Sequence, residues 1–348
     1  MKFPPRFPLA TLPTPLQEAR RLRAALGGDG RCPRILIKRD DLTGLAFGGN
    51  KGRKLEFIIA EALRQGAATV ITTGAAQSNH ARMTAAAARL AGLDCALVLT
   101  SPTDHPALTG NLLLDRLLGA DVHVVPASDD PRLPFGHEAA KVDELVETLT
   151  ARGRRPYVIP VGGSSAFGAL GYVVAAMELA GQLLDAGINA DYLYFPSGSR
   201  GTQAGLTLGA RALNATYRLR GIAVSGGEAE KVVRGSRVAN EAAVLLGIDL
   251  HVGEADVTTD QGYIGAAYGV PTPACLDAIV LLAHTEGLFL DPVYSGKAMA
   301  GLLDHIRTGR ISPSETVVFL HTGGTPALFA HAETLEAAAR AHATSHAD

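Results

Sequence analysis

Residues 37–56 read IKRDDLTGLAFGGNKGRKLE, and the interpretation of the whole chain starts from this stretch. A short β-rich run leads into a glycine-rich loop, and the loop delivers Lys51 to the start of a helix predicted over 53–65. The positive end of a helix dipole disfavours an ammonium group, which helps to keep the Lys51 amine neutral. Such an amine is a nucleophile toward a carbonyl group and can form a Schiff base.

A phosphate-binding loop of a nucleotide kinase is one alternative interpretation of the same stretch. That motif needs a glycine, four residues, a second glycine and then lysine at once, followed by Ser or Thr. Here Asn50 separates Gly49 from Lys51, and Gly52 follows the lysine. The kinase motif therefore fails at two positions. By residue type alone, the simplest alternative is a solvated lysine in the first turn of a helix.

Short β-rich runs alternate with longer Ala/Leu-rich segments of helical spacing along the rest of the chain. Such alternation is typical of parallel sheets covered by helices on both faces, so the predicted fold class is α/β. Strands are predicted over 35–38, 69–73, 96–100, 121–125, 157–159, 192–195, 221–224 and 316–320. Helices are predicted over 53–65, 80–91, 110–118, 137–151, 169–186 and 202–214.

The strand–helix alternation between residues 51 and 163 predicts a small sheet of its own. We therefore expect a small inserted α/β domain of residues 51–163. The larger domain is expected to combine residues 1–50 with residues 164–348.

Composition narrows the class of partner. The 348 residues are 47% hydrophobic and carry 32 Lys and Arg against 34 Asp and Glu, without the basic surface expected of a nucleic-acid binder. Three distant cysteines suit neither a disulfide framework nor a zinc site. Prolines interrupt the first 16 residues, and no apolar run approaches the roughly 18 residues of a membrane helix. We expect a cytoplasmic protein whose partner is a small molecule, with no bound metal, nucleic acid or membrane.

Two other loops carry groups that suit anion binding. QSNH at 77–80 lies between a predicted strand and a predicted helix, where ordinary helix capping by Ser78 or Asn79 explains part of the pattern. SGSRGT at 197–202 also joins a strand to a helix, and its consecutive N–H groups can form a seat for a phosphate. A glycine-rich turn is more often only a tight connection, so this loop is weak evidence by itself.

Six ordered motifs make the chain resemble a known family over nearly its whole length. They are residues 37–56, QSNHARMTAAAA at 77–88, RPYVIPVGGSSAFGALGY at 155–172, SGSRGTQAGL at 197–206, LDPVYSGKAMAGL at 290–302 and HTGGTPALFA at 321–330. They resemble the fold-type II, tryptophan synthase β-like enzymes, and within them the D-cysteine desulfhydrase and 1-aminocyclopropane-1-carboxylate deaminase family. The resemblance implies two open twisted, mostly parallel sheets, pyridoxal 5'-phosphate bound by the larger domain, and a homodimer.

The resemblance also implies roles for individual residues. The implied catalytic residues are Lys51, which forms the Schiff base, and Ser78, Tyr268 and Tyr294. The implied cofactor-binding residues are Lys51, Asn79 at the ring hydroxyl, the phosphate loop of Ser197, Gly198, Ser199, Arg200, Gly201 and Thr202, and Thr322 at the ring nitrogen. The implied substrate-binding residues are Ser78, Asn79, His80, Tyr268, Tyr294 and Ser295.

Three of these residues also have simpler or open interpretations. Arg200 stands where the family carries a small residue, and either adds charge to the phosphate site or points to solvent. Tyr268 lies among turn-forming residues, where tyrosines usually serve packing, and Thr322 is also a plausible end for the strand predicted over 316–320.

The reaction implied by the resemblance is the α,β-elimination of D-cysteine to pyruvate, hydrogen sulfide and ammonia. Deaminases that open the cyclopropane ring carry Glu and Leu where this chain has Ser295 and Thr322, which favours the desulfhydrase. The alternatives on the same scaffold are 1-aminocyclopropane-1-carboxylate deaminase, L-cysteate sulfo-lyase and serine deaminase. A pyridoxal-phosphate carrier or sensor without turnover is the alternative from another class.

Overall fold

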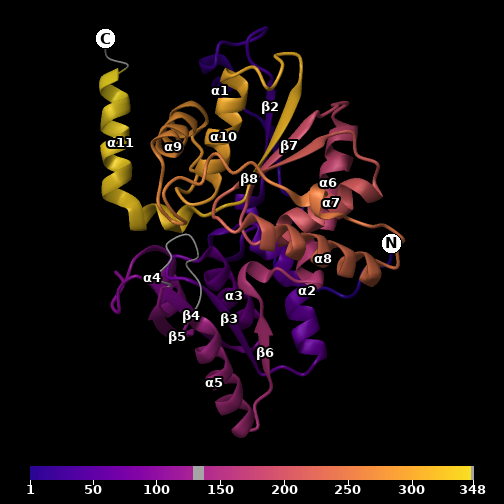
Figure 1. Ribbon diagram of the computed structural model, residues 1–348, viewed down its shortest axis with the longest axis vertical. Helices are drawn as coiled ribbons and strands as arrows, with labels where there is room; N and C mark the ends of the chain where they lie inside the picture. The colour runs from indigo at the N-terminus through magenta and orange to yellow at the C-terminus, as the bar shows by residue number, and fades with distance from the viewer. Residues whose placement is uncertain (128–136, 346–348) are drawn as a thin grey trace.

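The computed structural model describes residues 1–127 and 137–345. Its strands form a larger sheet in the order β1-β2-β9-β7-β8 and a smaller sheet in the order β5-β4-β3-β6. Neighbouring strands are parallel except for β1 and β2. The larger sheet with its helices occupies the upper half of Figure 1 and the smaller sheet the lower half. The predicted α/β class with two mostly parallel sheets is confirmed.

All eight predicted strands are present. The strands are β1 Leu16–Glu18, β2 Arg34–Arg39, β3 Thr69–Ala75, β4 Asp94–Ser101, β5 Asp121–Pro126, β6 Pro156–Ile159, β7 Tyr192–Ser197, β8 Arg218–Ala223 and β9 Thr316–His321. The strand that the sequence did not predict is β1, which has only three residues and is half-buried at the edge of the larger sheet. It is too short for an alternation of apolar and polar residues to identify it.

The six predicted helices are also present, with ends shifted by up to three residues. The helices are α1 Arg20–Ala25, α2 Lys51–Arg64, α3 Asn79–Leu90, α4 Gly110–Leu117, α5 Glu138–Ala151, α6 Ala166–Asp185, α7 Gly201–Ala212, α8 Glu228–Leu246, α9 Pro273–Glu286, α10 Ser295–Arg307 and α11 Ala332–Ser345. The helices α1 and α8 to α11 were not predicted from the sequence pattern. The buried face of α8 consists largely of small residues, which weakens its apolar periodicity.

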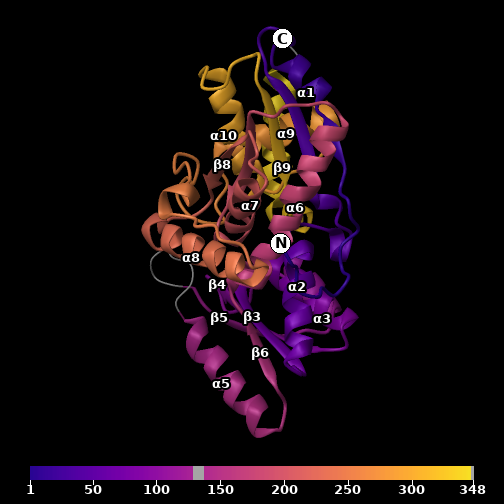
Figure 2. The ribbon, with the colours of Figure 1, turned by 90° about the vertical axis from the view of Figure 1, so that its right-hand side faces the viewer.

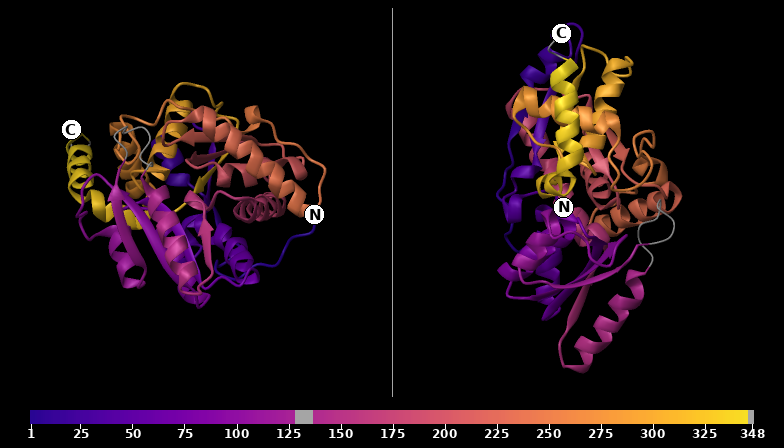
Figure 3. Two further views of the ribbon diagram at one scale, coloured as in Figure 1. Left: turned by 60° about the horizontal axis from the view of Figure 1, so that its bottom comes forward. Right: turned by 90° about the vertical axis from the view of Figure 1, so that its left-hand side faces the viewer.

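The smaller sheet is built from one continuous stretch of chain, since β3 to β6 all lie within residues 69–159. Alternate side chains along its strands pack on opposite sides. Val70 and Leu97 contact the cluster that includes α3, whereas Ile71 and Val98 pack with α5. The left view of Figure 3 shows these strands side by side, and Figure 2 shows α5 at the lower end of the molecule. The boundaries of the inserted domain stay a prediction.

The larger sheet is also covered on both faces. Its side chains Ile35, Ile37 and Phe319 pack in one cluster with α1, α9 and α10. The alternate residues Leu36 and Val318 pack in another with α6 and α7. The helix α11, the yellow helix that faces the viewer in the upper part of the right view of Figure 3, packs on α9. Burial of both faces explains why the parallel strands read as nearly continuous apolar runs.

One described helix, α6, is long and apolar enough to span a membrane by length and composition. This finding departs from the expectation that no apolar run approaches that length. Residues that make up 56% of its most apolar window are buried inside the protein, and α6 packs against α2, α7 and α8. A helix that is apolar around most of its surface needs neighbours that cover it. Because three helices cover α6, it is a core helix.

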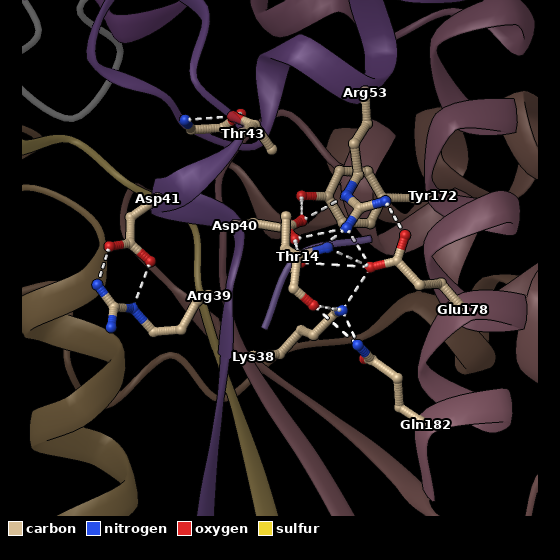
Figure 4. A network of polar contacts seen from close by, with 11 residues as sticks. Thr14, Lys38, Arg39, Asp40, Asp41, Thr43, Arg53, Tyr172, Glu178 and Gln182 are labelled. Atoms are coloured by element: carbon tan, nitrogen blue, oxygen red, sulfur yellow. Dashed lines mark hydrogen bonds and ion pairs between the residues drawn. The ribbon is translucent and has the colours of Figure 1, made fainter. Parts of the chain in front are cut away.

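A buried network of charges fixes the start of α2 to β2 and α6 (Figure 4). Arg53 Nη2 donates to Asp40 Oδ1 and to Glu178 Oε1, each at 2.8 Å. Lys38 Nζ donates to Glu178 Oε1 at 2.5 Å. Arg53 lies two residues after Lys51, so the network holds the turn of α2 that carries this lysine.

Removing the Glu178 carboxylate should destabilise the protein. We expect Glu178→Gln to lower the free energy of unfolding by about 3–5 kcal/mol, because it leaves the buried cations of Arg53 and Lys38 without a full counter-charge. The matched control is Glu144→Gln, which breaks an exposed pair with Lys141 and should cost under about 1 kcal/mol. Denaturant titrations of both variants measure the two losses, and equal losses would contradict a stabilising network.

The same carboxylate should make stability depend on pH. Burial alone would raise the pKa of Glu178, but hydrogen bonds and the charges of Arg53 and Lys38 outweigh burial and lower the pKa to about 2. The folded state therefore favours the ionised carboxylate, and its contribution is lost as pH falls from about 4.5 toward 2. Glu178→Gln should show a shallower loss of unfolding free energy over this range.

Candidate active site

A cavity of about 250 Å³ lies at the carboxyl ends of strands from both sheets. Many of its lining residues lie at or just after the ends of β3, β6, β7, β8 and β9, and others belong to the starts of α2, α3 and α8 or are Tyr268 and Tyr294. Open α/β sheets bind ligands at this edge, and the volume approaches the roughly 300 Å³ at the lower end of small-molecule sites. Every predicted site residue except Gly201 and Ser295 lines this cavity.

Lys51 is the first residue of α2 and faces the cavity from a loop of unusual backbone shape. Gly48 in this loop has φ +70°, and a Cβ atom there would lie 1.9 Å from Asp41 O. The loop is joined to the end of β9, because Asn50 N donates to Thr322 O at 3.0 Å. Burial lowers the pKa of Lys51 to about 8. The amine is therefore far more readily deprotonated than an ordinary lysine, as a Schiff-base nucleophile requires.

Ser78 caps the N-terminus of α3. Its Oγ accepts a hydrogen bond from Ala81 N at 3.1 Å, so the capping interpretation of this residue is correct. A hydroxyl that accepts in this way still has its own hydrogen to donate. Ser78 lines the cavity and is therefore able to serve as a cap and as a donor to a ligand.

His80 is a neutral, buried side chain in the cavity wall. Burial, helped by the nearby Lys51 and Lys54, lowers the pKa of His80 well below its usual value. Its Nε2 lies 2.9 Å from Thr72 Oγ1, which donates to Ile159 O at 2.8 Å. These contacts tie α3 to β3 and β6, so His80 has a structural function whether or not it also contacts a substrate.

The loop after β7 fits a phosphate group. Arg200 has φ +71°, and α7 begins at Gly201, where the first N–H groups of the helix have no partner within the helix. A Cβ atom at Gly201 would lie 2.6 Å from Lys54 Nζ and 2.8 Å from Ser164 Oγ. Ser164 Oγ in turn donates to Ser199 Oγ at 2.7 Å. A helix N-terminus, a buried lysine amine and two hydroxyls therefore meet around a glycine, which suits anion binding.

Lys54 was missed by the sequence analysis. It is fully buried, and Nζ donates to Gly162 O at 2.5 Å. Burial, followed by the charge of Lys51, lowers its pKa well below the ordinary value. Residues three apart share a face of a helix, so its spacing from Lys51 is a signal that sequence reasoning can use.

Arg200 lines the cavity and does not point to solvent, and its contribution of charge to the phosphate site stays a prediction. It is buried, and its guanidinium donates from Nη1 to Ser197 Oγ and from Nη2 to Thr259 Oγ1, each at 2.8 Å. It also forms an ion pair with Glu228 at the start of α8. Arg200 therefore links the loop 197–202 to Thr259 and to α8, and the Glu228 carboxylate offsets its charge.

Tyr268 and Tyr294 form a pair at the cavity. Their hydroxyl oxygens lie 2.6 Å apart and their rings meet edge to face, with centroids 6.0 Å apart. Burial raises the pKa of Tyr268 to about 12 and that of Tyr294 well above its usual value, so both stay protonated near neutral pH. A Cβ atom at Gly198 would lie 3.4 Å from the Tyr294 ring, which places this ring against the phosphate loop.

Ser295 lies beneath the cavity wall and is fully buried. Its Oγ donates to Asp291 Oδ1 at 2.6 Å and accepts from Asp291 N at 2.8 Å. Asp291 also accepts from Tyr294 N at 2.9 Å, so this turn holds Tyr294 in place. The geometry thus gives Ser295 a supporting position, and its contact with a substrate stays a prediction. Thr322, in contrast, lines the cavity at the end of β9.

The start of α8 adds a part of the wall that the sequence analysis did not identify. Gly226, Lys231 and Arg234 line the cavity there. Lys231 Nζ donates to Ser225 Oγ at 2.7 Å, and burial lowers its pKa to about 8. No sequence motif predicts that this segment lines the cavity, because its place there depends on how α8 packs against α7.

Comparisons with known proteins agree with this geometry. A family model described as pyridoxal-phosphate dependent enzyme matches residues 8–323. The chain is 44% identical to the D-cysteine desulfhydrase of Klebsiella pneumoniae (strain 342), over 94% of this chain and 96% of the relative. It is 43% identical to the D-cysteine desulfhydrase of Salmonella choleraesuis (strain SC-B67), with the same coverage. A crystal structure of an ACC deaminase homologue matches at a TM-score of 0.85 and 40% identity, over 97% of both chains. The chain therefore belongs to the pyridoxal-phosphate dependent enzymes.

Proposed function

We propose that this chain is a D-cysteine desulfhydrase, which converts D-cysteine and water into pyruvate, hydrogen sulfide and ammonia. The observation that supports this activity most strongly is the identity of 43–45% to D-cysteine desulfhydrases over 94% of the chain. The cavity supports it further, because a lysine of lowered pKa, a serine hydroxyl and a protonated tyrosine pair face one space.

Residues of the cavity would hold pyridoxal phosphate at both ends. Lys51 would carry it covalently, the loop 197–202 with Lys54 would hold its phosphate, and Asn79 and Thr322 would meet the ring hydroxyl and ring nitrogen. When bound, the cofactor withdraws electrons from the α-carbon of an amino acid and so acidifies the α-proton. A threonine at the ring nitrogen offers a hydrogen bond without a formal charge.

The side chains then divide the proton transfers. The Lys51 amine, when it is not linked to the cofactor, would accept the α-proton at Nζ, which its pKa of about 8 permits near neutral pH. Ser78 would bind the substrate carboxylate with its free hydroxyl hydrogen. The Tyr294 hydroxyl would donate a proton to the departing sulfur, since it is protonated and hydrogen-bonded to Tyr268. Elimination gives aminoacrylate, whose imine form takes up water to yield pyruvate and ammonia.

A panel of substrates tests the proposed reaction. Purified enzyme saturated with pyridoxal phosphate is assayed for pyruvate from D-cysteine, L-cysteate and D-serine, with sulfide and sulfite measured alongside. The same enzyme is assayed for 2-oxobutyrate and ammonia from 1-aminocyclopropane-1-carboxylate. We expect the highest kcat/KM for D-cysteine, with equal amounts of pyruvate and sulfide.

Each other outcome of the panel identifies a different activity. Preference for L-cysteate with sulfite release would make the enzyme a sulfo-lyase, and preference for D-serine a deaminase. Ring opening as the main reaction would favour the function suggested by the similarity to an ACC deaminase homologue. Bound cofactor without turnover of any substrate would leave a carrier or sensor.

We also propose a cytoplasmic homodimer. Large apolar side chains are exposed on α4 and on the neighbouring turn Thr325–His331, among them Leu117 at 73% and Phe329 at 67% exposure. Such residues are candidates for a subunit interface. The free cysteines Cys32, Cys95 and Cys275 are all buried, which suits a reducing compartment. Light scattering of the purified chain measures its oligomeric state, and a monomer at all concentrations would contradict the dimer.

A further inference from the structure

The side chain of Asn79 is held from behind by a buried asparagine. Asn111, in the first turn of α4, is fully buried, and its Nδ2 donates to Asn79 Oδ1 and to Gln77 O, each at 2.9 Å. Its Oδ1 accepts from Arg82 Nη1 at 2.9 Å. Both ends of the Asn111 amide are therefore engaged by neighbours from α3 and the loop that precedes it.

These neighbours leave the Asn111 amide one orientation. A guanidinium is only a donor and a backbone carbonyl is only an acceptor, so Arg82 fixes the oxygen of Asn111 and Gln77 O fixes its nitrogen. The Asn111 nitrogen must then face an acceptor on Asn79. If the Asn79 amide were reversed, two NH₂ groups would face each other beside the buried Asn111 with no hydrogen bond between them.

Arg82 is itself fixed from several directions. It is fully buried, and its Nη2 donates to Gly48 O at 2.9 Å, in the loop that leads to Lys51. Asp115, one turn after Asn111 on α4, is buried nearby. Burial raises the pKa of Asp115 to about 8, so this carboxyl is mostly neutral near neutral pH. The two terminal nitrogens of Arg82 donate to the neutral oxygens of Asn111 and Gly48.

From this geometry we infer that Asn111, held by Arg82, is a positioning residue that makes Asn79 present its Nδ2 hydrogens, rather than its oxygen, to the ring hydroxyl of the cofactor. The inference rests on the proposed contact between Asn79 and that hydroxyl. A donor at this place stabilises the ionised form of the ring oxygen. Arg82 and Asn79 of α3 and Asn111 of α4 therefore form a chain of hydrogen bonds that sets the charge state of the ring.

The variant Asn111→Asp removes the hydrogen bond donor that faces Asn79, while the side chain at position 111 keeps nearly the same shape. Aspartate retains an acceptor for Arg82 but has no donor for Asn79 or for Gln77 O, so the Asn79 amide should turn and direct its oxygen at the ring hydroxyl. We expect the apo protein to bind pyridoxal phosphate about 10- to 100-fold more weakly, as for the loss of a hydrogen bond to a charged group. The absorption of the bound cofactor should shift toward the form with a neutral ring hydroxyl.

Two matched variants separate positioning from a general loss of structure. Asn240→Asp makes the same exchange in α8, where Asn240 Nδ2 donates to Val252 O and Oδ1 accepts from Val252 N, and should leave affinity and spectrum unchanged. Asn79→Ala removes the group through which Asn111 acts. In that background Asn111→Asp should change cofactor affinity by no more than about twofold, because the two effects share one contact.

The possible results are distinguishable without a substrate. Losses that multiply in the double variant, or an unchanged affinity and spectrum in Asn111→Asp, would overturn the inference. If Asn79→Ala alone has no effect, the proposed contact with the ring hydroxyl fails, and the inference fails with it. If Asn111→Asp does not fold, the uncharged Asn111→Ala serves in the same cycle, with the same convergence expected. The substrate panel tests the proposed reaction separately, on the unmodified enzyme.

Discussion

Lys51→Ala should bind pyridoxal phosphate only non-covalently and should lose measurable turnover. The substitution removes the amine that forms the Schiff base and the group proposed to accept the α-proton. Loss of a general base alone costs about 10²–10⁴-fold in rate, and loss of the covalent link adds to it. The absorption band of the linked cofactor and the release of pyruvate should disappear together, which spectroscopy and the pyruvate assay measure on one sample.

Lys54→Met is the matched control for this result, because it removes another lysine amine from the same helix face. Here we expect weaker binding of the cofactor, through loss of a phosphate partner, but an intact covalent link at saturating concentration. A Lys51→Ala enzyme that keeps both its band and its activity would remove Lys51 from the mechanism.

The pH dependence of cofactor loading follows from the same amine. Lys51 must be neutral to attack the aldehyde, and burial lowers its pKa to about 8. The rate at which apo protein forms the covalent link should therefore rise as pH approaches about 8 and level off above it. An ordinary lysine would still show a rising rate well above this point.

For Tyr294→Phe we expect turnover to fall about 10²–10⁴-fold while the cofactor stays bound. The phenol is protonated, hydrogen-bonded to Tyr268 at 2.6 Å and placed against the phosphate loop, which suits a proton donor to the leaving group. Phenylalanine keeps the ring and its packing, so the change isolates the hydroxyl. Steady-state kinetics and the cofactor absorption measure turnover and occupancy separately.

Tyr268→Phe is the comparison for this variant. It removes the partner hydroxyl but leaves Tyr294 able to donate, so its loss of turnover should be smaller. Equal rates for wild type and Tyr294→Phe would make this tyrosine a packing residue.

Much of the fold follows from local sequence. The eight predicted strands are short apolar runs whose burial on both faces requires that pattern, and six helices carry enough apolar periodicity to be recognised. The helix α8 escaped because its buried face relies on residues such as Gly235 and Ala239, which give little contrast with the exposed face. Its place depends on packing against α6 and α7, and local sequence does not reveal such contacts.

The loops of the site were predictable because glycine, hydroxyl and amide residues gather at strand ends. The partners of these residues were not, because they come from distant parts of the chain. Glu228 offsets the charge of Arg200 from 28 residues away, and Asn111 orients Asn79 across 32 residues. Ser295 is a case in which the local motif predicted a site residue that does not line the cavity. Its hydroxyl donates to Asp291 behind the cavity wall instead.

Lys51, rather than the neighbouring Lys54, is the lysine proposed to carry the cofactor. Reduction of the loaded enzyme with borohydride fixes a Schiff base permanently, and peptide mapping by mass spectrometry then identifies the modified lysine. We predict that the pyridoxyl group will be found on Lys51 in one-to-one ratio with the chain. A modified Lys54, or a chain that carries no adduct after incubation with excess pyridoxal phosphate, would contradict the account.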